Sequence, residues 1–420
     1  MTQDRAAPHA LPVPGTVNET AEAVARRSYG KLVAFLAARS RDVAGAEDAL
    51  AEAFAAALES WPRNGVPDTP EAWLLTVARR KMIDVARQRR SGDSAADHLV
   101  LLAELAEGEE ADTHIPDERL ALMFACAHPA IDAGVRSPLI LQTILGFDAA
   151  AIASAFLVSP ATMGQRLVRA KSRIRQAGIP FRVPGPDELQ ERLQAVLDAI
   201  YAAYAEGWVD PAGADARRRN LADEAIWLGR LVASLLPHEP EALGLLSLML
   251  HAHARRGARR DAAGAYVPLT QQDPALWDAP MIDEAEQLLL EAGRLDGIGR
   301  YQLEAAVQSA HSVRQRSGQS DWSAIARLYD ALWALTASPV VAINRAIAMA
   351  EVDGPHAGLA ALDALAGDAR LSDYQPWWAA RAGLLARSGQ HAAADKAYEQ
   401  AIGLERGPAV RRFLQDQRMR

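Results

Sequence analysis

The sequence predicts an all-α protein with more than one domain. Alanine and leucine dominate most segments, good helix formers fill the surface positions, and no segment sustains the period-2 alternation of β-branched residues typical of strands. With 420 residues, half of them hydrophobic, the chain is long enough to bury more than one core. Its one cysteine, Cys126, excludes an intramolecular disulfide and a cysteine-rich zinc site, and it fits a reducing compartment.

Three breaks in the helical pattern divide the chain. Residues 62–70 are rich in proline and form a loop, residues 91–116 are acidic and rich in small residues, and residues 178–186 carry three prolines. We therefore expect a flexible N-terminus over 1–18, a first helical domain over 19–90, an acidic linker over 91–116, a second helical domain over 117–182 and an all-helical region over 187–420.

The net charge of −8 hides a segregation of charge along the chain. Residues 73–90 contain six basic residues and one acid, residues 91–118 contain nine acids and no lysine or arginine, and residues 160–186 contain six basic residues and no acid. The overall charge argues against a nucleic-acid partner, but two basic blocks separated by an acidic spacer need an explanation.

Residues 149–176 have the pattern of a helix-turn-helix. A helix over 149–156 and a turn over 157–160 precede a second helix over 161–176, with Ser159 as its N-cap and Pro160 at the first helical position. The second helix has an apolar stripe of Met163, Leu167, Ala170 and Ile174, and a different face of Thr162, Arg166, Arg169 and Arg173. Such a helix suits the major groove, where an arginine–guanine pair contributes about 1–3 kcal/mol to discrimination. A merely solvated arginine-rich face is the alternative.

The other basic block lies on a helix that follows the 62–70 loop. Its arginines at 79, 80, 87 and 90 fall within a sector of roughly 100°, away from the apolar positions. Trp73, near the start of this helix, could stack on an unpaired base, a contact worth about 1–3 kcal/mol. Packing in the core is the alternative, and without further context the residues favour it.

Residues 46–59 form an amphipathic helix of another kind. Asp48, Glu52 and Glu59 share one narrow face, and Leu50, Phe54 and Leu58 occupy the other side. An acidic face does not approach phosphates. It is either solvated or a docking surface for a basic protein partner.

The C-terminal region carries signs of a helical repeat. Trp378, Ala382, Gly389, Ala394, Tyr398 and Ala401 have the spacing of a tetratricopeptide unit, with Pro408 slightly late. A weaker copy covers residues 344–365, with Ala346, Gly358, Leu362 and Leu365 in equivalent places. Stacked helix pairs of this kind offer a groove for a peptide or protein, and an all-helical bundle without repeats is the alternative.

Taken together, these segments resemble a bacterial RNA polymerase sigma factor of the extracytoplasmic-function (ECF) type. The helix that binds core polymerase is resembled by the stretch AGAEDALAEAFAAALESWP (44–62). The helix for the −10 element is resembled by EAWLLTVARRKMIDVARQRR (71–90). The −35-binding domain is resembled by SPLILQTILGFDAAAIASAFLVSPATMGQRLVRAKSRIRQ (137–176). Segments at 199–210, 243–256, 300–312 and 338–350 resemble the branch with a long tetratricopeptide-like C-terminal extension.

The resemblance implies that residues 19–90 are sigma region 2, which binds the β′ clamp of core RNA polymerase and melts the −10 element of promoter DNA. Polymerase binding is implied for Asp48, Glu52, Phe54 and Leu58. Contacts with the −10 element are implied for Asn64, Trp73, Arg79, Arg80, Arg87 and Arg90.

The resemblance also implies that residues 117–182 are sigma region 4, which reads the −35 element and meets the β flap of the polymerase. The residues implied in DNA binding are Ser159, Thr162, Gln165, Arg166, Arg169, Lys171 and Arg173. The acidic linker is implied to lie beside cationic polymerase channels. Two features depart from the family pattern: residues 156–159 lack the usual turn glycine, and Gly164 stands where a basic residue is common.

Other classes of function have less support. The sequence has no phosphate loop, nucleophile elbow or HEXXH zinc motif, and Cys126 and His128 lie in an apolar helical context that indicates core packing. His251 and His253 are two residues apart and cannot share a helical face, which disfavours a metal site. We therefore expect no enzyme activity, no metal and no cofactor.

Two alternatives without catalysis are a helix-turn-helix regulator that never joins polymerase and a helical scaffold. The acidic face of residues 46–59 and the second basic helix disfavour the regulator, because it needs neither. No signal peptide or membrane span is visible, so we expect a cytoplasmic protein. For the C-terminal region we expect a regulatory domain that does what a separate anti-sigma factor does elsewhere, or one that binds a protein or peptide partner.

Overall fold

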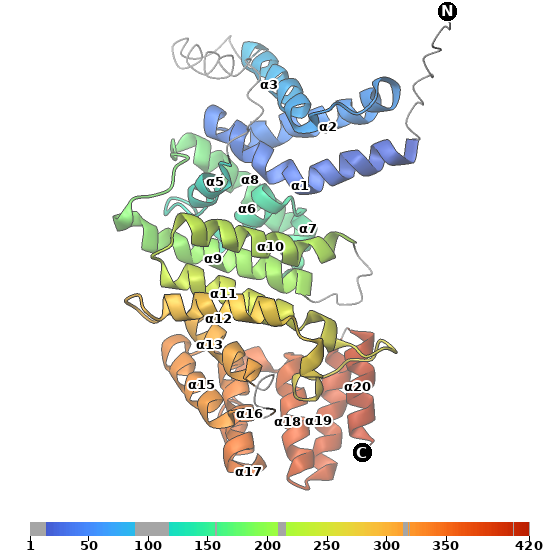
Figure 1. Ribbon diagram of the computed structural model, residues 1–420, viewed down its shortest axis with the longest axis vertical. Coiled ribbons are helices and arrows are strands. Elements are labelled where there is room, and N and C mark those ends of the chain that lie inside the picture. Colours follow the sequence, from blue (N-terminus) through green and yellow to red (C-terminus); the bar gives the residue numbers. More distant parts are fainter. Residues whose placement is uncertain are drawn as a thin grey trace, which may run out of the picture. The chain divides into compact units, whose positions relative to one another are not determined.

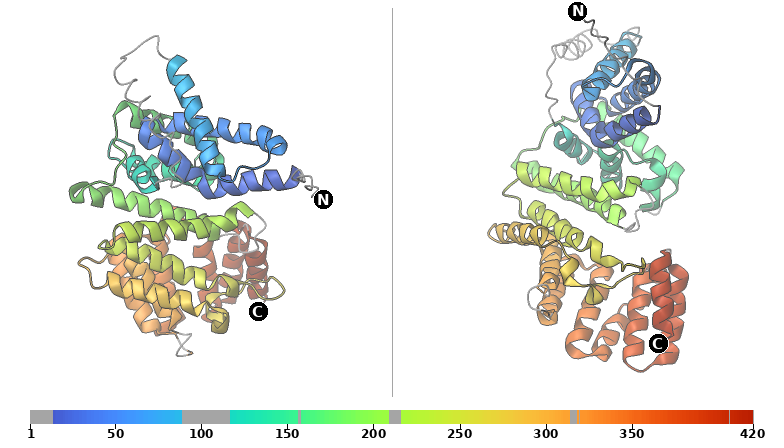
Figure 2. Two further views of the ribbon diagram at one scale, coloured as in Figure 1. Left: turned by 45° about the horizontal axis from the view of Figure 1, so that its top comes forward. Right: turned by 45° about the vertical axis from the view of Figure 1, so that its right-hand side comes forward.

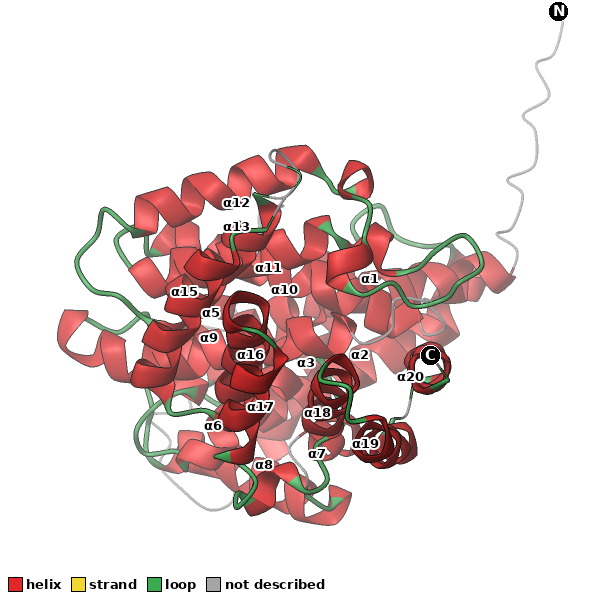
Figure 3. Ribbon diagram, turned by 90° about the horizontal axis from the view of Figure 1, so that it is seen from below, coloured by secondary structure: helices red, strands yellow, loops and turns green. Residues whose placement is uncertain are grey.

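The computed structural model describes residues 14–88, 117–155, 158–208, 216–313, 318, 320–405 and 407–419. Over these residues the regular structure is helical apart from one isolated bridge between Arg260 and Tyr266, as Figure 3 shows. The prediction of an all-α protein is confirmed. The expected acidic linker and most of the expected flexible N-terminus lie outside the described residues. In the part that the structure describes, no helix is long and apolar enough to cross a membrane.

The chain forms two compact units, residues 1–203 and 204–420. The helices can be followed in Figure 1. The first unit contains α1 (Pro14–Ser40), α2 (Val43–Asn64), α3 (Pro70–Gln88), α5 (Arg119–Cys126), α6 (Ala133–Leu145), α7 (Ala149–Ala155), α8 (Pro160–Gln176) and most of α9 (Pro186–Trp208).

The second unit is also helical. It contains α10 (Ala216–Leu235), α11 (Pro240–Ala254), the 3-10 turns η2 (Arg256–Arg259), η3 (Leu269–Gln271) and η4 (Pro274–Leu276), α12 (Ala279–Ala292), α13 (Arg300–Ser312), α15 (Trp322–Thr336), α16 (Pro339–Asp353), α17 (Pro355–Asp363), η5 (Ala369–Leu371), α18 (Gln375–Arg387), α19 (His391–Leu404) and α20 (Pro408–Arg418).

Two boundaries differ from the expected ones. The sequence divides the chain at 182–187, whereas the two compact units meet within α9. The physical reason is that polar contacts join α9 to α6 of the first unit: the Ser137 hydroxyl donates to the Ala195 carbonyl at 3.4 Å, and the Arg136 guanidinium lies 3.9 Å from the Glu191 carboxylate. The first helix begins at Pro14, before the expected start at 19, because proline is well tolerated in the first turn of a helix.

Helices α1, α2 and α3 pack on one another at the start of the first unit, as both views of Figure 2 show. The Asp42 carboxylate caps α2 by accepting from the Gly45 amide at 3.1 Å, and Gly65 ends the helix at φ +84°. The apolar positions of α2 recur every three or four residues, so Leu50 and Trp61 are fully buried. This packing fixes the direction in which the acidic face of α2 points.

Helices α5 to α8 form the rest of the first unit. Asp132 caps α6, and Gly146 ends that helix in the left-handed conformation, at φ +68°. Both α5 and α6 pack against α1. The closest approach is at Gly30 of α1, where an added Cβ would lie 2.0 Å from the Ile144 carbonyl oxygen, so only glycine fits without a shift of the backbone.

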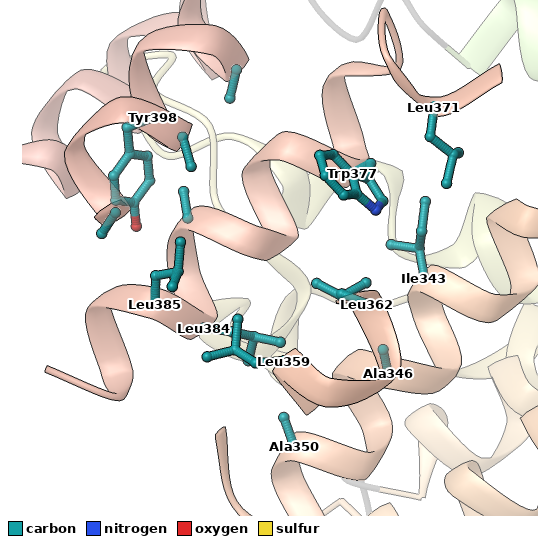
Figure 4. Packing of buried hydrophobic residues seen from close by; sticks show 14 of the residues in the cluster. Ile343, Ala346, Ala350, Leu359, Leu362, Leu371, Trp377, Leu384, Leu385 and Tyr398 are labelled. Atoms are coloured by element: carbon teal, nitrogen blue, oxygen red, sulfur yellow. The ribbon is translucent and has the colours of Figure 1, made fainter. Parts of the chain in front are cut away.

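In the second unit, α11 packs against α10, α12 and α13. The middle turns of α11 are buried on every side. The helix therefore carries apolar residues such as Leu245, Leu246 and Leu250 around its circumference and has no polar face there. Farther along, α16 to α20 bury a common cluster around Leu362, Trp377 and Leu385, as Figure 4 shows.

The residues at repeat spacing lie in paired helices of this cluster. Helices α18 and α19 pack side by side around a turn at Gly389, whose φ is +77°. Buried between these helices and their neighbours are Ala382, Ala394, Tyr398 and Ala401. In the α16–α17 pair an added Cβ on Gly358 would lie 2.6 Å from the Ala350 Cβ, so the small side chains there allow close packing.

Candidate nucleic-acid and protein interfaces

Helix α8, which follows the short helix α7 in the chain, begins with a side-chain cap. The Ser159 hydroxyl accepts from the Thr162 amide at 3.2 Å, and Pro160 occupies the first turn of α8. The stripe that was expected to be buried, Met163, Leu167, Ala170 and Ile174, is buried. The local start of the helix and its inward face therefore follow from the sequence.

The outward face of α8 is basic. The side chains of Arg166, Arg169 and Arg173 are exposed, and no carboxylate of the described residues forms an ion pair with them. Ser159 and Gln165 are exposed beside them, and Thr162 is half-buried, with its hydroxyl 2.8 Å from that of Ser159. An unpaired row of guanidinium groups on one helix can contact phosphates and base edges.

Lys171 lies on another face of α8. Its ammonium donates to the Glu47 carboxylate of α2 at 2.5 Å, and each side chain is only 12% exposed. One turn later, the Arg175 guanidinium lies 3.2 Å from the Asp42 carboxylate at the start of α2. We call these four residues the α2–α8 junction. The sequence pattern missed Asp42, Glu47 and Arg175, and it placed Lys171 at DNA.

Burial shapes the electrostatics of this region. Desolvation raises the pKa of Glu47, and the charge and hydrogen bond of Lys171 act in the opposite direction. Burial also raises the pKa of the nearby Tyr29 phenol, and the negative charges of Glu47 and Asp48 raise this pKa further. Lys171 is therefore the group that offsets part of the effect of burial on the Glu47 carboxyl group.

The acidic face of α2 points to solvent. Asp48 and Glu52 are exposed, Leu58 is 49% exposed and Phe54 is half-buried. Glu52 forms an exposed ion pair with Lys81 of α3 at 2.7 Å, an interaction that raises the pKa of Lys81. An exposed pair of this kind contributes little to stability, so a protein partner could replace it at low cost.

Helix α3 carries the first basic block. Its Trp73 is half-buried and stacks edge-on against the buried Trp61 of α2, with ring centroids 5.6 Å apart. The Arg79 guanidinium lies 5.1 Å from the centre of the Phe35 ring, whereas Arg80 is exposed. In the last turn of α2, exposed Asn64 donates to the Ser60 hydroxyl at 3.1 Å. Trp73 thus takes part in packing and is only partly buried.

Two of the residues expected to contact the −10 element have little structural description. Arg87 lies in the last turn of α3, with its side chain outside the described part, and Arg90 falls outside the described residues altogether.

The remaining titratable candidates have separate partners. The buried Cys126 thiol lies 3.6 Å from the Thr143 hydroxyl, while His128 accepts from the Ala130 amide. Buried His251 lies 3.3 Å from the Ser312 hydroxyl, and His253 lies 3.4 Å from the Asp223 carboxylate. Over the residues that the structure describes, no three His, Cys, Asp or Glu side chains gather as they would around a metal ion.

Comparison with known proteins shows which families the chain resembles. Residues 24–92, which span α2 and α3, match the model of sigma-70 region 2, and residues 192–293 match a family of unknown function, DUF6596. A protein of Rhizobium meliloti (strain 1021), described as "Uncharacterized protein R00370", is 43% identical over 365 residues, which cover 86% of each chain. No solved structure matches the chain.

A sigma-70 region 2 implies binding to core RNA polymerase and promoter DNA. The exposed acidic face of α2 and the basic α3 that follows it both lie inside the matched segment. Residues 24–92 therefore match a sigma-70 region 2, and the chain belongs to one family with the Rhizobium meliloti protein.

Proposed function

We propose that the protein is a sigma factor of the ECF type, which binds core RNA polymerase and directs it to specific promoters. The observation that carries the proposal is the combination of a sigma-70 region 2 over residues 24–92 with the capped α7–α8 pair and its exposed arginines. A DNA-binding regulator that never meets polymerase has no need for the first of these. In this account the protein acts by binding, without a cofactor, in the cytoplasm.

In the first unit, α2 docks on polymerase and α3 holds the melted −10 element. Asp48, Glu52 and Leu58 form the exposed surface for the β′ clamp, and Phe54 supports it from a half-buried position. Arg80 reaches the displaced strand from the exposed side of α3. The Trp61–Trp73 pair holds these two helices in a fixed orientation.

Helix α8 reads the −35 element. Arg166, Arg169 and Arg173 are the residues that contact bases or phosphates, with Ser159 and Gln165 beside them at the entry to the groove. The polymerase β flap supports this half of the unit. Affinity for DNA falls steeply with salt, because each phosphate contact releases counterions.

The second unit acts through its helical pairs as a tetratricopeptide-like regulatory domain for a protein or peptide partner. The buried small residues around Ala382 and Gly358 support this role, because they let neighbouring helices stack closely. Truncating the chain after Trp208 keeps α9 on the first unit and removes the rest. We expect promoter output to change; unchanged output together with unchanged polymerase binding would end the regulatory proposal.

Co-elution of the full chain with purified core polymerase tests the main proposal. We expect stable co-elution of the wild type and a loss of about tenfold or more in affinity for Asp48→Arg, since charge reversal in an interface costs several kcal/mol. Asp353→Arg, an exposed reversal in the second unit, is the matched control. A wild-type protein that does not co-elute would contradict the proposal.

A further inference from the structure

The end of α11 and the turn η2 that follows it carry four arginines within six residues, at positions 255, 256, 259 and 260. Arg255 is 6% exposed, and the other three arginines are half-buried. Arginine is almost never buried so fully unless a partner of opposite charge accompanies it. These four residues, which we call the α11 arginine cluster, therefore call for a source of negative charge.

The guanidinium group of Arg255 is bonded to a neutral neighbour. Its Nη2 donates to the side-chain oxygen of Gln308 on α13, and its Cζ lies 5.8 Å from the centre of the Trp277 ring. The buried Nη1 makes no hydrogen bond in the part of the chain that the structure describes, and no carboxylate there forms an ion pair with this guanidinium. A buried cation with an unbonded nitrogen carries a large desolvation cost, which an anion would offset.

Acidic side chains of the neighbouring elements have other partners. Asp261 accepts from two backbone amides of its own loop, and Asp278 caps α12. Glu286 accepts from the Ser309 hydroxyl at 2.7 Å. The chain thus uses these three carboxylates for local hydrogen bonds and leaves the charge of Arg255 unbalanced.

The negative end of the α11 dipole explains only part of the cluster. Cations near the C-terminus of a helix are stabilised by the carbonyl groups there. That effect does not account for the burial of a guanidinium group beside another positive charge. Burial lowers the pKa of Arg255 to about 10, and the charge of Arg259 acts in the same direction. The cluster therefore holds more positive charge than its own surroundings balance.

We propose that the α11 arginine cluster binds the phosphate group of a small molecule, with Arg255 and Arg259 as its main ligands. The planar fork of a guanidinium group matches a pair of phosphate or carboxylate oxygens with two hydrogen bonds. A phosphate fits several arginines better than a carboxylate does, because it carries close to two negative charges and three acceptor oxygens. The burial of Arg255 favours a small ligand over the backbone of a nucleic acid. This inference goes beyond the proposed function and does not depend on polymerase.

Isothermal titration calorimetry of the full chain, dialysed against phosphate-free buffer, measures this binding. The probes are inorganic phosphate and glycerol 3-phosphate, and sodium acetate at the same ionic strength is the control for a carboxylate and for general screening. We expect one site per chain, with a phosphate affinity about tenfold or more above that for acetate, because the second charge adds to the attraction. Stronger binding of the ester would identify a phosphorylated metabolite as the ligand, and stronger binding of the free ion would identify phosphate itself.

Substitutions in the cluster separate a ligand site from a packing role. Arg255→Met keeps most of the side-chain volume and is expected to lower phosphate affinity by about tenfold or more, since one charge-assisted fork is lost. Its unfolding temperature without phosphate is expected to stay unchanged or rise, because no buried charge remains. Arg259→Met gives the same test at a half-buried position, and Arg294→Met, exposed in the same unit, is the matched control.

Three results would overturn the proposal. The first is a wild type that binds neither phosphate probe, or binds acetate equally well. The second is an unchanged phosphate affinity in both Arg255→Met and Arg259→Met. The third is displacement of the bound phosphate by duplex DNA at a matched concentration of phosphate groups, which would assign the cluster to nucleic acid. Because polymerase is absent from these measurements, their outcome is independent of the test of sigma-factor function.

Discussion

The ammonium group of Lys171 lies 2.5 Å from the carboxylate of Glu47, although 124 residues separate them in the chain. The contact joins α8 to α2 in a position where each side chain is only 12% exposed. A charge pair in such a place contributes less to stability than its geometry suggests, but losing one partner is costly because the other charge stays buried.

Replacing Lys171 with methionine is therefore expected to destabilise the first unit by about 2–4 kcal/mol at pH 7. The double variant Glu47→Gln/Lys171→Met is expected to recover most of this loss, since no buried charge remains. Hydrogen exchange of peptides from α2 and α8, followed by mass spectrometry, reports the local free energy of opening. A single variant as protected as the wild type would show that the pair is unimportant.

The basic face of α8 predicts a particular salt dependence of DNA binding. Arg166→Ala and Arg169→Ala should each lower affinity and reduce the slope of log affinity against log salt by about 0.9 if the side chain contacts one phosphate. Arg175→Ala is the matched control, because that guanidinium faces Asp42. Fluorescence anisotropy with upstream duplex DNA at several salt concentrations measures the slopes. Equal slopes for all three variants would place the DNA elsewhere.

The aromatic pair of α2 and α3 predicts a large loss of stability. Trp61 is 1% exposed, so Trp61→Ala leaves a cavity and is expected to cost about 3–5 kcal/mol of unfolding free energy. Trp73→Ala should cost less, because Trp73 is half-buried. Chemical denaturation followed by circular dichroism compares the two variants, and an equal loss would contradict the packing described for this pair.

The second unit should lose stability in acid. Burial, and then the neighbouring Arg255, lowers the pKa of His251 from 6.5 to about 3. Below about pH 6.5 this histidine is protonated in the unfolded chain but stays neutral in the folded chain. The free energy of unfolding therefore falls as the pH is lowered from about 6.5 towards about 3, by up to about 1.4 kcal/mol per pH unit.

Thermal unfolding between pH 7 and pH 4 tests this dependence. His251→Gln is expected to flatten it, whereas substitution of the exposed His391 is expected to leave it unchanged. A wild-type unit whose unfolding temperature is the same across this range would contradict the assignment of a buried neutral histidine.

Local features of the fold could be predicted from the sequence because they depend on neighbours in the chain. The cap at Ser159 and the buried stripe that contains Met163 and Leu167 follow from helical spacing and one hydroxyl group. The all-α class follows from composition in the same way. The structure adds the start of α1 at Pro14 and the end of the first compact unit within α9; the second of these depends on contacts between helices.

Long-range pairings could not be predicted in this way. Nothing near Lys171 distinguishes it from the exposed arginines of α8, because its partner Glu47 lies on a distant helix. Gly30 likewise looks like an ordinary helical glycine until Ile144 is placed against it. The roles of Asp48, Arg80 and Arg166 remain predictions, since exposure on the right helix permits a contact without proving it.

Run-off transcription tests the central claim most directly. Purified core polymerase is supplied with the DNA upstream of the protein's own gene, with the full chain present or absent, and Arg80→Ala and Arg166→Ala are compared with the control Asp353→Arg. We predict a specific transcript that requires the protein, persists in the control and falls by about tenfold or more in each arginine variant, given the 1–3 kcal/mol of a base contact. Absence of any specific transcript, together with no association with polymerase, would contradict the assignment as a sigma factor.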